Sequence, residues 1–502
     1  MMSGDWFSSF DPGKLADIFL FNEDDRLLFN SSFFLLFFSV FLLFYQFFYK
    51  RKLTRVLIFT LFSLYFFYKA CGWYVSFIVI AAIVDFTLSN WIYKAKTKTE
   101  KKSLLIFSVV INLGLLAFFK YTNLFIETLN SISSGNINTL DLVLPIGISF
   151  YTFENLSYTI DVYRGHFKPV SSFWDYCFFL SFFPKLVMGP IVRASDFIPQ
   201  IRKDLSVSSY DISYGLFLIL GGLFKKVVIS DYIYANFVEF IFNDPSRYTG
   251  LECLLGVYGY AMVIYCDFSG YSDMAIGMGR WMGFEININF RTPYQSSNIT
   301  EFWRRWHISL SSWLRDYLYI SLGGNRKGKF RTYVNLMITM LLGGLWHGAS
   351  WNFVVWGGLH GLALGLDKLK VSLVKEWKSI QNPVGALLWK VGGVLFTFHF
   401  VCFCWVFFKC ETFSDSGTFL RNIFLNFYPE GFPALWENYR SVFLVMMFGY
   451  LVHFVPARFD HWVINRLAPA PLLVKIGVTC LFIWIVIQTK QANPVMIIYL
   501  QF

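Results

Sequence analysis

Long apolar runs follow one another through most of this sequence. A helix that spans a bilayer needs about 20 mostly apolar residues. Runs that approach or meet this length, with soft boundaries, lie at 32–49, 54–69, 73–93, 103–120, 140–160, 173–192, 211–230, 250–267, 332–349, 351–367, 385–408, 440–456 and 472–489. Some of these are expected to be re-entrant or interfacial helices, which leaves roughly 11 crossings. The runs predict an all-α polytopic integral membrane protein.

The composition excludes other classes of protein. The chain is 56% hydrophobic and only 15% charged, whereas soluble domains are about 25% charged, and a soluble chain this apolar would expose large apolar patches. A disordered chain needs low hydrophobicity, and eight cysteines without a CxxC pair exclude a disulfide scaffold. The net charge of +11 is spread as short basic clusters between apolar runs, a pattern typical of cytoplasmic loops rather than of nucleic-acid binding.

The basic loops predict the orientation. Lys and Arg cluster at 50–55, 94–102 and 368–378, whereas 122–141 contains neither. Because Lys and Arg accumulate in cytoplasmic loops, we expect the first three segments to face the cytoplasm and the fourth to face outward.

The same reasoning predicts the domain organisation. Residues 1–30 are acidic, so they do not begin as a secretory signal peptide would. We expect them to form an extracytoplasmic N-terminal segment, followed by one membrane-embedded domain over 31–502.

Three polar islands interrupt the apolar runs, and ionisable residues at membrane depth are usually functional. The first island, 266–291, brings Asp267, Ser269, Tyr271 and Asp273 to the end of an apolar run. These side chains either line a substrate path or cap and pack the end of a helix.

The second island is predicted to be one helix from Asn298, with Glu301 as its capping-box partner, to the stop at Gly323. Its polar candidates are Arg304, Arg305, His307, Ser311 and Arg315. The last three of these share one helix face. The helix is either an interfacial amphipathic helix anchored by its aromatic residues, or the lining of a catalytic cavity whose arginines face an anionic ligand.

The third island, 341–361, contains His347 inside a long apolar stretch. Glycines at 343, 344 and 348 indicate a helix break, whose free backbone groups must face a cavity or other protein. We therefore expect His347 to be deep, enclosed by protein and close to a polar path. It is either a catalyst or a hydrogen-bonded structural residue, and for His360 an interhelical hydrogen bond is the preferred interpretation.

Two such histidines predict acid–base chemistry on a neutral polar group such as a hydroxyl. A metal site is not expected, because 40 residues separate His307 from His347 and HExxH does not occur. The sequence also lacks a Walker A motif, which argues against an ATP-driven pump, and GxSxG, which argues against an α/β-hydrolase. A proton-relay transporter and a scaffold for partner enzymes remain alternatives.

Five segments, taken in this order and spacing, resemble one known family. They are PIGISFYTFENLSYTIDVYRG (145–165), FFPKLVMGPIVRASDFIPQI (182–201), DFSGYSDMAIGMGRWMGF (267–284), FWRRWHISLSSWLRDYLYISLGGN (302–325) and LWHGASWNFVVWGGLHG (345–361). The chain is similar to membrane-bound O-acyltransferases (MBOAT), in their bacterial alginate O-acetylation branch. The D-alanyl transfer proteins of lipoteichoic acid modification share these motifs.

The resemblance implies a ring of membrane helices around a thinned centre with a cross-membrane tunnel, in the bacterial inner membrane, and a catalytic core at about 140–370. It implies that the near-invariant family histidine is His347 and the second is His307. It further implies an acetyl group taken from a cytoplasmic donor, acetyl-CoA as a substrate rather than a resident cofactor. The acetyl group then passes to a periplasmic acetyltransferase partner that modifies a polysaccharide. D-alanyl or another acyl group is the alternative.

These expectations give the candidate residues their roles. His347 would act as a general base, kept neutral by burial, and His307 would orient the acceptor or stabilise the oxyanion; a covalent acetyl-His347 is a less favoured variant. Arg304 and Arg305 would bind donor phosphates. The further candidates for substrate or donor binding are Ser311, Arg315, Asp267, Asp273 and Asn352.

Overall fold

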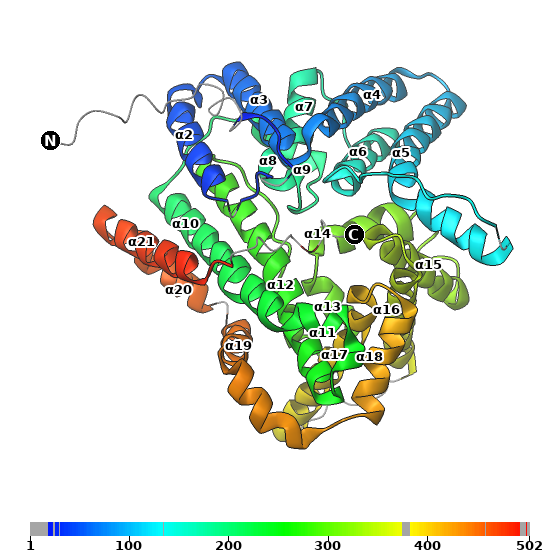
Figure 1. Cartoon of the computed structure of the whole chain (residues 1–502). Helices are drawn as coiled ribbons and strands as arrows, with labels where there is room; N and C mark the ends of the chain where they lie inside the picture. The colour runs from blue at the N-terminus through cyan, green and yellow to red at the C-terminus, as the bar shows by residue number, and fades with distance from the viewer. Residues whose placement is uncertain are drawn as a thin grey trace. The chain divides into compact units, whose positions relative to one another are not determined.

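The computed structural model describes residues 19–23, 26–29, 31–133, 135–373, 382–456, 458–491 and 498. Helix is the only regular secondary structure in these ranges (Figure 1). The prediction of an all-α fold is therefore confirmed. Most of the expected acidic N-terminal segment, including residues 1–18, lies outside the described residues.

Six described helical stretches are long and apolar enough to cross a membrane, and a bent pair of helices would make a seventh. The six are Lys52–Lys94, Lys98–Ser133, Ser209–Asn243, Gly250–Trp281, Pro383–Lys409 and Leu472–Thr489. Helices also form over the expected runs at 332–349 and 351–367, but they are not among the six. The expectation of roughly 11 crossings stays a prediction.

The chain divides into two compact units. The first comprises the described residues up to Gly114, together with Val143–Val187 and Ala194–Leu205, and the second comprises Leu115–Leu142, Met188–Arg193 and the described residues from Ser206 onward. The expectation of a single membrane-embedded domain over 31–502 stays a prediction.

The first unit is built of short and medium helices around aromatic side chains. Its helices are α2 (Ser32–Phe48), α3 (Lys52–Cys71), η1 (Gly72–Tyr74), α4 (Val75–Lys94), the first half of α5 (Lys98–Ser133), α6 (Ile148–Arg164), α7 (Phe173–Ser181), α8 (Phe183–Leu186) and α9 (Ala194–Ile201). Phe183 lies at the centre, with its ring centroid 5.1 Å from Phe62 and 5.6 Å from Phe66. The Phe62 pair is edge to face and the Phe66 pair is tilted, and edge-to-face contact is a favourable geometry of aromatic pairs.

A polar network is also buried in the first unit. Asp85 accepts hydrogen bonds from the Ser108 hydroxyl at 2.6 Å, the Asn112 amide at 2.8 Å and the Thr159 hydroxyl at 3.2 Å. A buried carboxylate is tolerated only when such donors replace water. The network therefore links α4, α5 and α6.

The second unit carries all three polar islands. Its remaining helices are α10 (Ser209–Leu223), η2 (Phe224–Asp231), η3 (Tyr234–Val238), α11 (Glu239–Asn243), η4 (Pro245–Arg247), α12 (Gly250–Trp281), η5 (Pro293–Gln295), α13 (Ile299–Arg305), α14 (Ile308–Trp313), η6 (Leu314–Tyr319), α15 (Lys329–His347), α16 (Trp351–Leu373), α17 (Pro383–Lys409), α18 (Phe413–Leu425), η7 (Pro429–Gly431), α19 (Phe432–His453), α20 (Arg458–Leu467) and α21 (Leu472–Thr489). In this unit α10 packs along α12, and α15 packs along α16 (Figure 1).

Glycine allows α15 and α16 to pack at very short distance. A methyl group on Gly357 of α16 would collide with the carbonyl oxygen of Met340 on α15. Small residues at a helix crossing let two backbones approach closely, which is a common way of packing helices in membranes. The pair can therefore hold the residues at its ends, including His347, in fixed positions.

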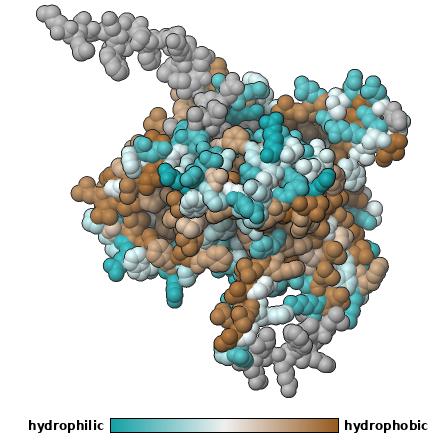
Figure 2. Space-filling view, turned by 60° about the horizontal axis from the view of Figure 1, so that its bottom comes forward, coloured by the Kyte–Doolittle hydropathy of each residue, from teal (hydrophilic) through white to brown (hydrophobic). Residues whose placement is uncertain are grey.

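Large apolar side chains cover wide parts of the face seen in Figure 2. Trp73 and Leu473 are each 81% exposed, and no residue of α21 is buried. Soluble proteins rarely expose patches of this kind. The surface therefore agrees with a protein whose solvent is a bilayer.

The glycine at the α15–α16 crossing can be tested with its neighbour as the control. We expect Gly357→Ala to lower the free energy of unfolding by about 1–3 kcal/mol, because the added methyl overpacks the crossing. Gly358→Ala should be neutral or stabilising by up to about 1 kcal/mol, because alanine favours the helix and its methyl would meet only the Leu341 side chain at 3.6 Å. Thermal unfolding in detergent measures both. Equal stability of the two variants would contradict the close crossing.

Candidate active site

The second island forms a broken helix, so the prediction of one continuous helix was wrong. Helix α13 ends at Arg305, α14 begins at Ile308, and His307 between them adopts left-handed backbone angles of φ 42° and ψ 55°. A short segment before α13 takes over the hydrogen bonds of the break: the Ile308 N–H donates to the Asn289 carbonyl at 3.0 Å. The predicted N-terminal cap of the helix was right in part. Asn298 caps α13, but Glu301 accepts from the N–H of Ser297 rather than completing a box with Asn298.

His307 is held at this break by one amide side chain. Asn289 Oδ1 accepts from the Ser309 N–H at 3.1 Å and from the Ser309 hydroxyl at 2.9 Å, and it lies 3.3 Å from His307 Nδ1. The His307 ring is fully buried and packs edge-on against Phe268 of α12 at 4.6 Å. A residue other than glycine at positive φ costs about 1–3 kcal/mol, and such strain concentrates at functional sites.

His347 stands at the second break. It is the last residue of α15, Gly348 after it is extended, and α16 begins at Trp351. The predicted break is confirmed, although Gly343 and Gly344 remain inside the helix. His347 is 3% exposed, with its ring 5.0 Å from the ring of Trp356.

The structure brings the two predicted catalytic histidines together. The ring centroids of His307 and His347 lie 6.5 Å apart, although 40 residues separate them in the sequence. Both imidazoles are buried, which favours the neutral form that can accept a proton. Within the described ranges, no three His, Cys, Asp or Glu side chains are grouped so that they could hold a metal ion, and the expectation of a metal-free site stays a prediction.

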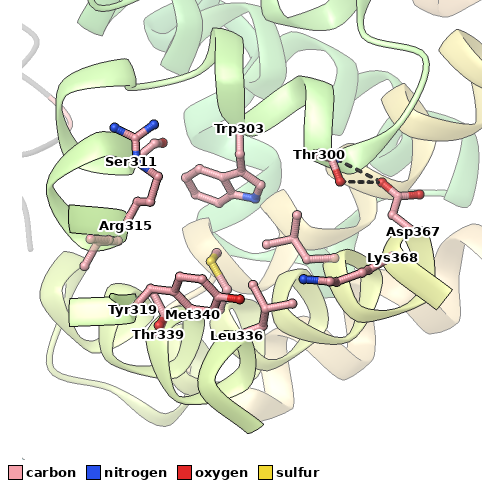
Figure 3. A pocket seen from close by; sticks show the side chains of 12 residues that line it. Thr300, Trp303, Ser311, Arg315, Tyr319, Leu336, Thr339, Met340, Asp367 and Lys368 are labelled. Atoms are coloured by element: carbon pink, nitrogen blue, oxygen red, sulfur yellow. Dashed lines mark hydrogen bonds between the residues drawn. The ribbon is translucent and has the colours of Figure 1, made fainter. Parts of the chain in front are cut away.

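A cavity of about 400 Å³ opens between α13, α14, η6, α15 and α16 (Figure 3). Its lining is mostly apolar, with two cationic side chains, Arg315 and Lys368, on different sides of the space. The lining residues are Thr300, Trp303, Ser311, Leu314, Arg315, Tyr319, Leu336, Thr339, Met340, Leu364, Asp367 and Lys368. Ser311 and Arg315 were predicted as binding residues, and both lie here. Such a cavity suits a ligand with an apolar arm and an anionic end.

Two tryptophans connect the cavity to His347. The Trp303 side chain lines the cavity, and its indole N–H donates to His360 Nδ1 at 3.3 Å. The Trp303 ring also packs against Trp356 at 5.8 Å, and Trp356 in turn contacts His347. The expected interhelical hydrogen bond of His360 is thus confirmed, and the residue shapes the wall between the cavity and His347.

Arg315 is held by an ion pair on one edge of the cavity. Its Nε donates to Asp316 Oδ1 at 2.6 Å, and Arg193 donates to the other oxygen of the same carboxylate. Burial acts to raise the pKa of Asp316, but hydrogen bonds and charge from Arg315 and Arg193 outweigh it and lower that pKa. Two cations on one carboxylate leave a net positive charge at this edge.

The other predicted binding residues lie outside the cavity lining. Arg304 is exposed, and Arg305 pairs with Glu301 at 2.6 Å. Asn352 is buried, and its amide donates to the Cys410 carbonyl at 2.8 Å.

Asp267 and Asp273 of the first island lie inside α12 rather than at a helix end, because this helix runs on to Trp281, and the rest of the island follows the helix. Asp267 pairs with Lys226 at 2.6 Å and Asp273 pairs with Lys225 at 2.7 Å, both across to η2. The two aspartates therefore fix the α12–η2 contact through ion pairs.

Two further residues beside the site were missed from the sequence. The expected run ended at residue 120, but α5 continues to Ser133. Lys120 Nζ donates to the carbonyls of Trp346 and His347 at 2.7 and 2.9 Å, and the Tyr121 hydroxyl donates to the Leu345 carbonyl at 2.7 Å. A lysine that directly follows a long apolar run was the available signal.

The fold and the site together define an integral membrane protein with two buried histidines placed for acid–base chemistry. The profile of MBOAT, the membrane-bound O-acyltransferase family, matches residues 166–410. Over 376 residues the chain is 36% identical to the peptidoglycan O-acetyltransferase of Helicobacter pylori, covering 70% of each chain.

Two further relatives show the breadth of the similarity. The chain is 43% identical over 350 residues to the probable alginate O-acetylase AlgI of Pseudomonas putida, covering 68% of this chain and 69% of that one. It is 30% identical over 285 residues to the teichoic acid D-alanyltransferase of Bacillus subtilis, covering 54% of this chain and 70% of that one. The chain belongs to the membrane-bound O-acyltransferase family and is an O-acyltransferase.

The amide that holds the first break is open to test. We expect Asn289→Ala to lower the acyl-transfer rate about 10- to 100-fold, because a loosened His307 loses its productive geometry. Asn289→Asp retains an oxygen acceptor for Ser309 and should keep more of the rate. Turnover of purified protein in lipid vesicles measures this. A wild-type rate for the alanine variant would show that Asn289 does not position His307.

Proposed function

We propose that this enzyme takes an acetyl group from cytoplasmic acetyl-CoA and passes it across the bacterial inner membrane. A periplasmic partner protein then O-acetylates an extracytoplasmic polysaccharide. The observation that carries the proposal is the pairing of His307 and His347, with rings 6.5 Å apart at two helix breaks. Relatives named for O-acetyl transfer to peptidoglycan and to alginate support acetyl as the group and a polysaccharide as the final acceptor.

His347 serves as the general base in this proposal. Its neutral imidazole takes the proton from an acceptor hydroxyl while the hydroxyl oxygen attacks the thioester carbonyl carbon. The C–O bond forms, the C–S bond breaks, and the imidazolium returns the proton to the thiolate that leaves. Proton transfer of this kind contributes about 10²–10⁴-fold to the rate.

His307 has a second role in the proposed reaction. Its ring lies close enough to His347 for one small reacting group to contact both imidazoles. Because Asn289 Oδ1 can only accept, His307 Nδ1 carries the proton of the neutral ring, and Nε2 is left to accept from the acceptor hydroxyl and orient it. The Asn289 contacts at the His307 break would hold the ring in position for this step.

The cavity is our proposed site for the donor. Lys368 belongs to a basic segment that we expect to face the cytoplasm. The apolar lining would take the pantetheine arm, and Arg315 and Lys368 would take its phosphates. The acyl end would then lie at Trp303, whose neighbour Trp356 contacts His347, and it would have to pass these side chains to react beside the two imidazoles.

A D-alanyl thioester is the second candidate donor, and the similarity to the teichoic acid D-alanyltransferase of Bacillus subtilis favours it. The same histidines would perform the same acyl transfer. Offering the purified protein acetyl-CoA and a D-alanyl thioester side by side decides between the two.

Removal of His347 tests the proposed base. We expect His347→Ala to reduce acetyl transfer from acetyl-CoA at least about 10²-fold, because the acceptor hydroxyl then loses its proton acceptor. His347→Gln keeps a hydrogen-bonding side chain of similar reach but cannot accept the proton, and it should be equally inactive. Protein yield and thermal unfolding should stay near wild type for the glutamine variant. Transfer by the alanine variant at the wild-type rate would refute the assignment.

The cations of the cavity test the donor site. We expect Arg315→Ala and Lys368→Ala each to raise KM for acetyl-CoA about 5- to 10-fold, because one charge contact with a phosphate contributes roughly 1 kcal/mol or more. Arg304→Ala is the matched control, since Arg304 is exposed and outside the cavity lining. Initial rates against acetyl-CoA concentration provide KM. A raised KM for the Arg304 variant alone would move the donor site away from the cavity.

A further inference from the structure

The carbonyl end of α15 carries an unusual arrangement. The last four carbonyls of a helix have no partner within the helix. In α15 these belong to residues 344–347, and Gly348 is extended rather than continuing the turn. Buried carbonyls without donors are costly, so something outside α15 must bond them.

Helix α5 supplies the donors. Lys120 Nζ reaches the carbonyls of Trp346 and His347, and the Tyr121 hydroxyl reaches that of Leu345. Three of the four terminal carbonyls are thereby bonded by two consecutive residues. One of the three belongs to His347 itself.

We propose that Lys120 is a positioning residue for acyl transfer. Its ammonium group fixes the carbonyl end of α15 and so holds the His347 imidazole in place beside His307. This role rests on the proposed function of His347 as the base.

A lysine suits this task better than a neutral donor. The C-terminus of a helix carries about half a negative charge, so a cation there is stabilised. The ammonium group can donate to two carbonyls at once, and hydrogen bonds from a charged donor are about twice as strong as neutral ones. Tyr121 donates one neutral hydrogen bond to the preceding carbonyl, and its loss should matter less.

The backbone explains why the effect reaches the imidazole. The His347 carbonyl is bonded through its own peptide group, so any movement of that group turns the Cα–Cβ bond and displaces the ring. Displacement of a catalytic group by about 1 Å can cost 10²-fold in rate. The residue therefore acts through His347, not on the substrate.

The test compares Lys120→Met, Lys120→Gln and Lys120→Arg with Tyr121→Phe, in purified protein reconstituted with acetyl-CoA as donor. We expect Lys120→Met to lower kcat about 10²-fold with KM for acetyl-CoA within about 3-fold of wild type. The kcat of Lys120→Gln should lie between those of Lys120→Met and wild type, because glutamine keeps hydrogen-bond donors but loses the charge. Lys120→Arg should recover kcat to within about 10-fold of wild type.

Tyr121→Phe is the matched control, because it removes a neutral hydrogen bond from the same helix end. We expect it to keep kcat within about 3-fold while lowering the unfolding temperature slightly. If Lys120→Met does not fold, the glutamine and arginine variants carry the comparison. A kcat for Lys120→Gln equal to that of wild type, or no recovery by a folded Lys120→Arg, would overturn the proposal.

His347→Ala separates this inference from the proposed function. Loss of transfer in His347→Ala with normal kcat in folded Lys120→Met or Lys120→Gln rejects only the role of Lys120. Retained transfer in His347→Ala rejects the base itself, and with it the positioning role.

Discussion

Backbone hydrogen bonding in a medium without water is the constraint on which this site depends. A helix that breaks inside a membrane protein frees N–H and C=O groups, and these must find partners in neighbouring protein. The chain breaks twice near its centre, at His307 and after His347. At the first break Asn289 accepts the hydrogen bonds, and at the second Lys120 and Tyr121 donate to the free carbonyls.

The two breaks also explain how distant residues meet. A continuous helix through residue 307 would carry its side chain along a regular face, whereas the left-handed turn buries it against Phe268. The other imidazole belongs to His347, the last residue of α15, the helix that crosses α16 closely at Gly357. The site is therefore a product of helix ends rather than of helix faces.

Much of the site could be predicted from local signals. Histidines in apolar surroundings, the glycine at 348 and the polar residues Ser311 and Arg315 pointed to residues that the structure places at the two helix breaks and in the cavity lining. The helix around His307 was predicted as continuous because local spacing alone favours it. The Asn289 oxygens that accept hydrogen bonds at the break come from an earlier part of the chain, which no local pattern reveals.

Long-range pairing accounts for the remaining differences. For Asp267 and Asp273 the sequence left a substrate lining and a capped helix end open, because their lysine partners lie more than 40 residues away. From the sequence, Lys120 marked only the end of an apolar run. The carbonyls to which it donates lie over 200 residues further along the chain. In both cases the role of a buried charged residue depends on the residue with which it pairs.

Trp303 and Trp356, which lie between the cavity and His347, have a consequence for the cell. Any passage that connected the two faces of the membrane would let protons flow down the electrochemical gradient. The Trp303 and Trp356 rings pack edge to face, and Trp356 packs in the same way on His347 and Phe408. Packed aromatic rings hold little water, so under the proposed transfer across the membrane this layer would keep protons from following the acyl group.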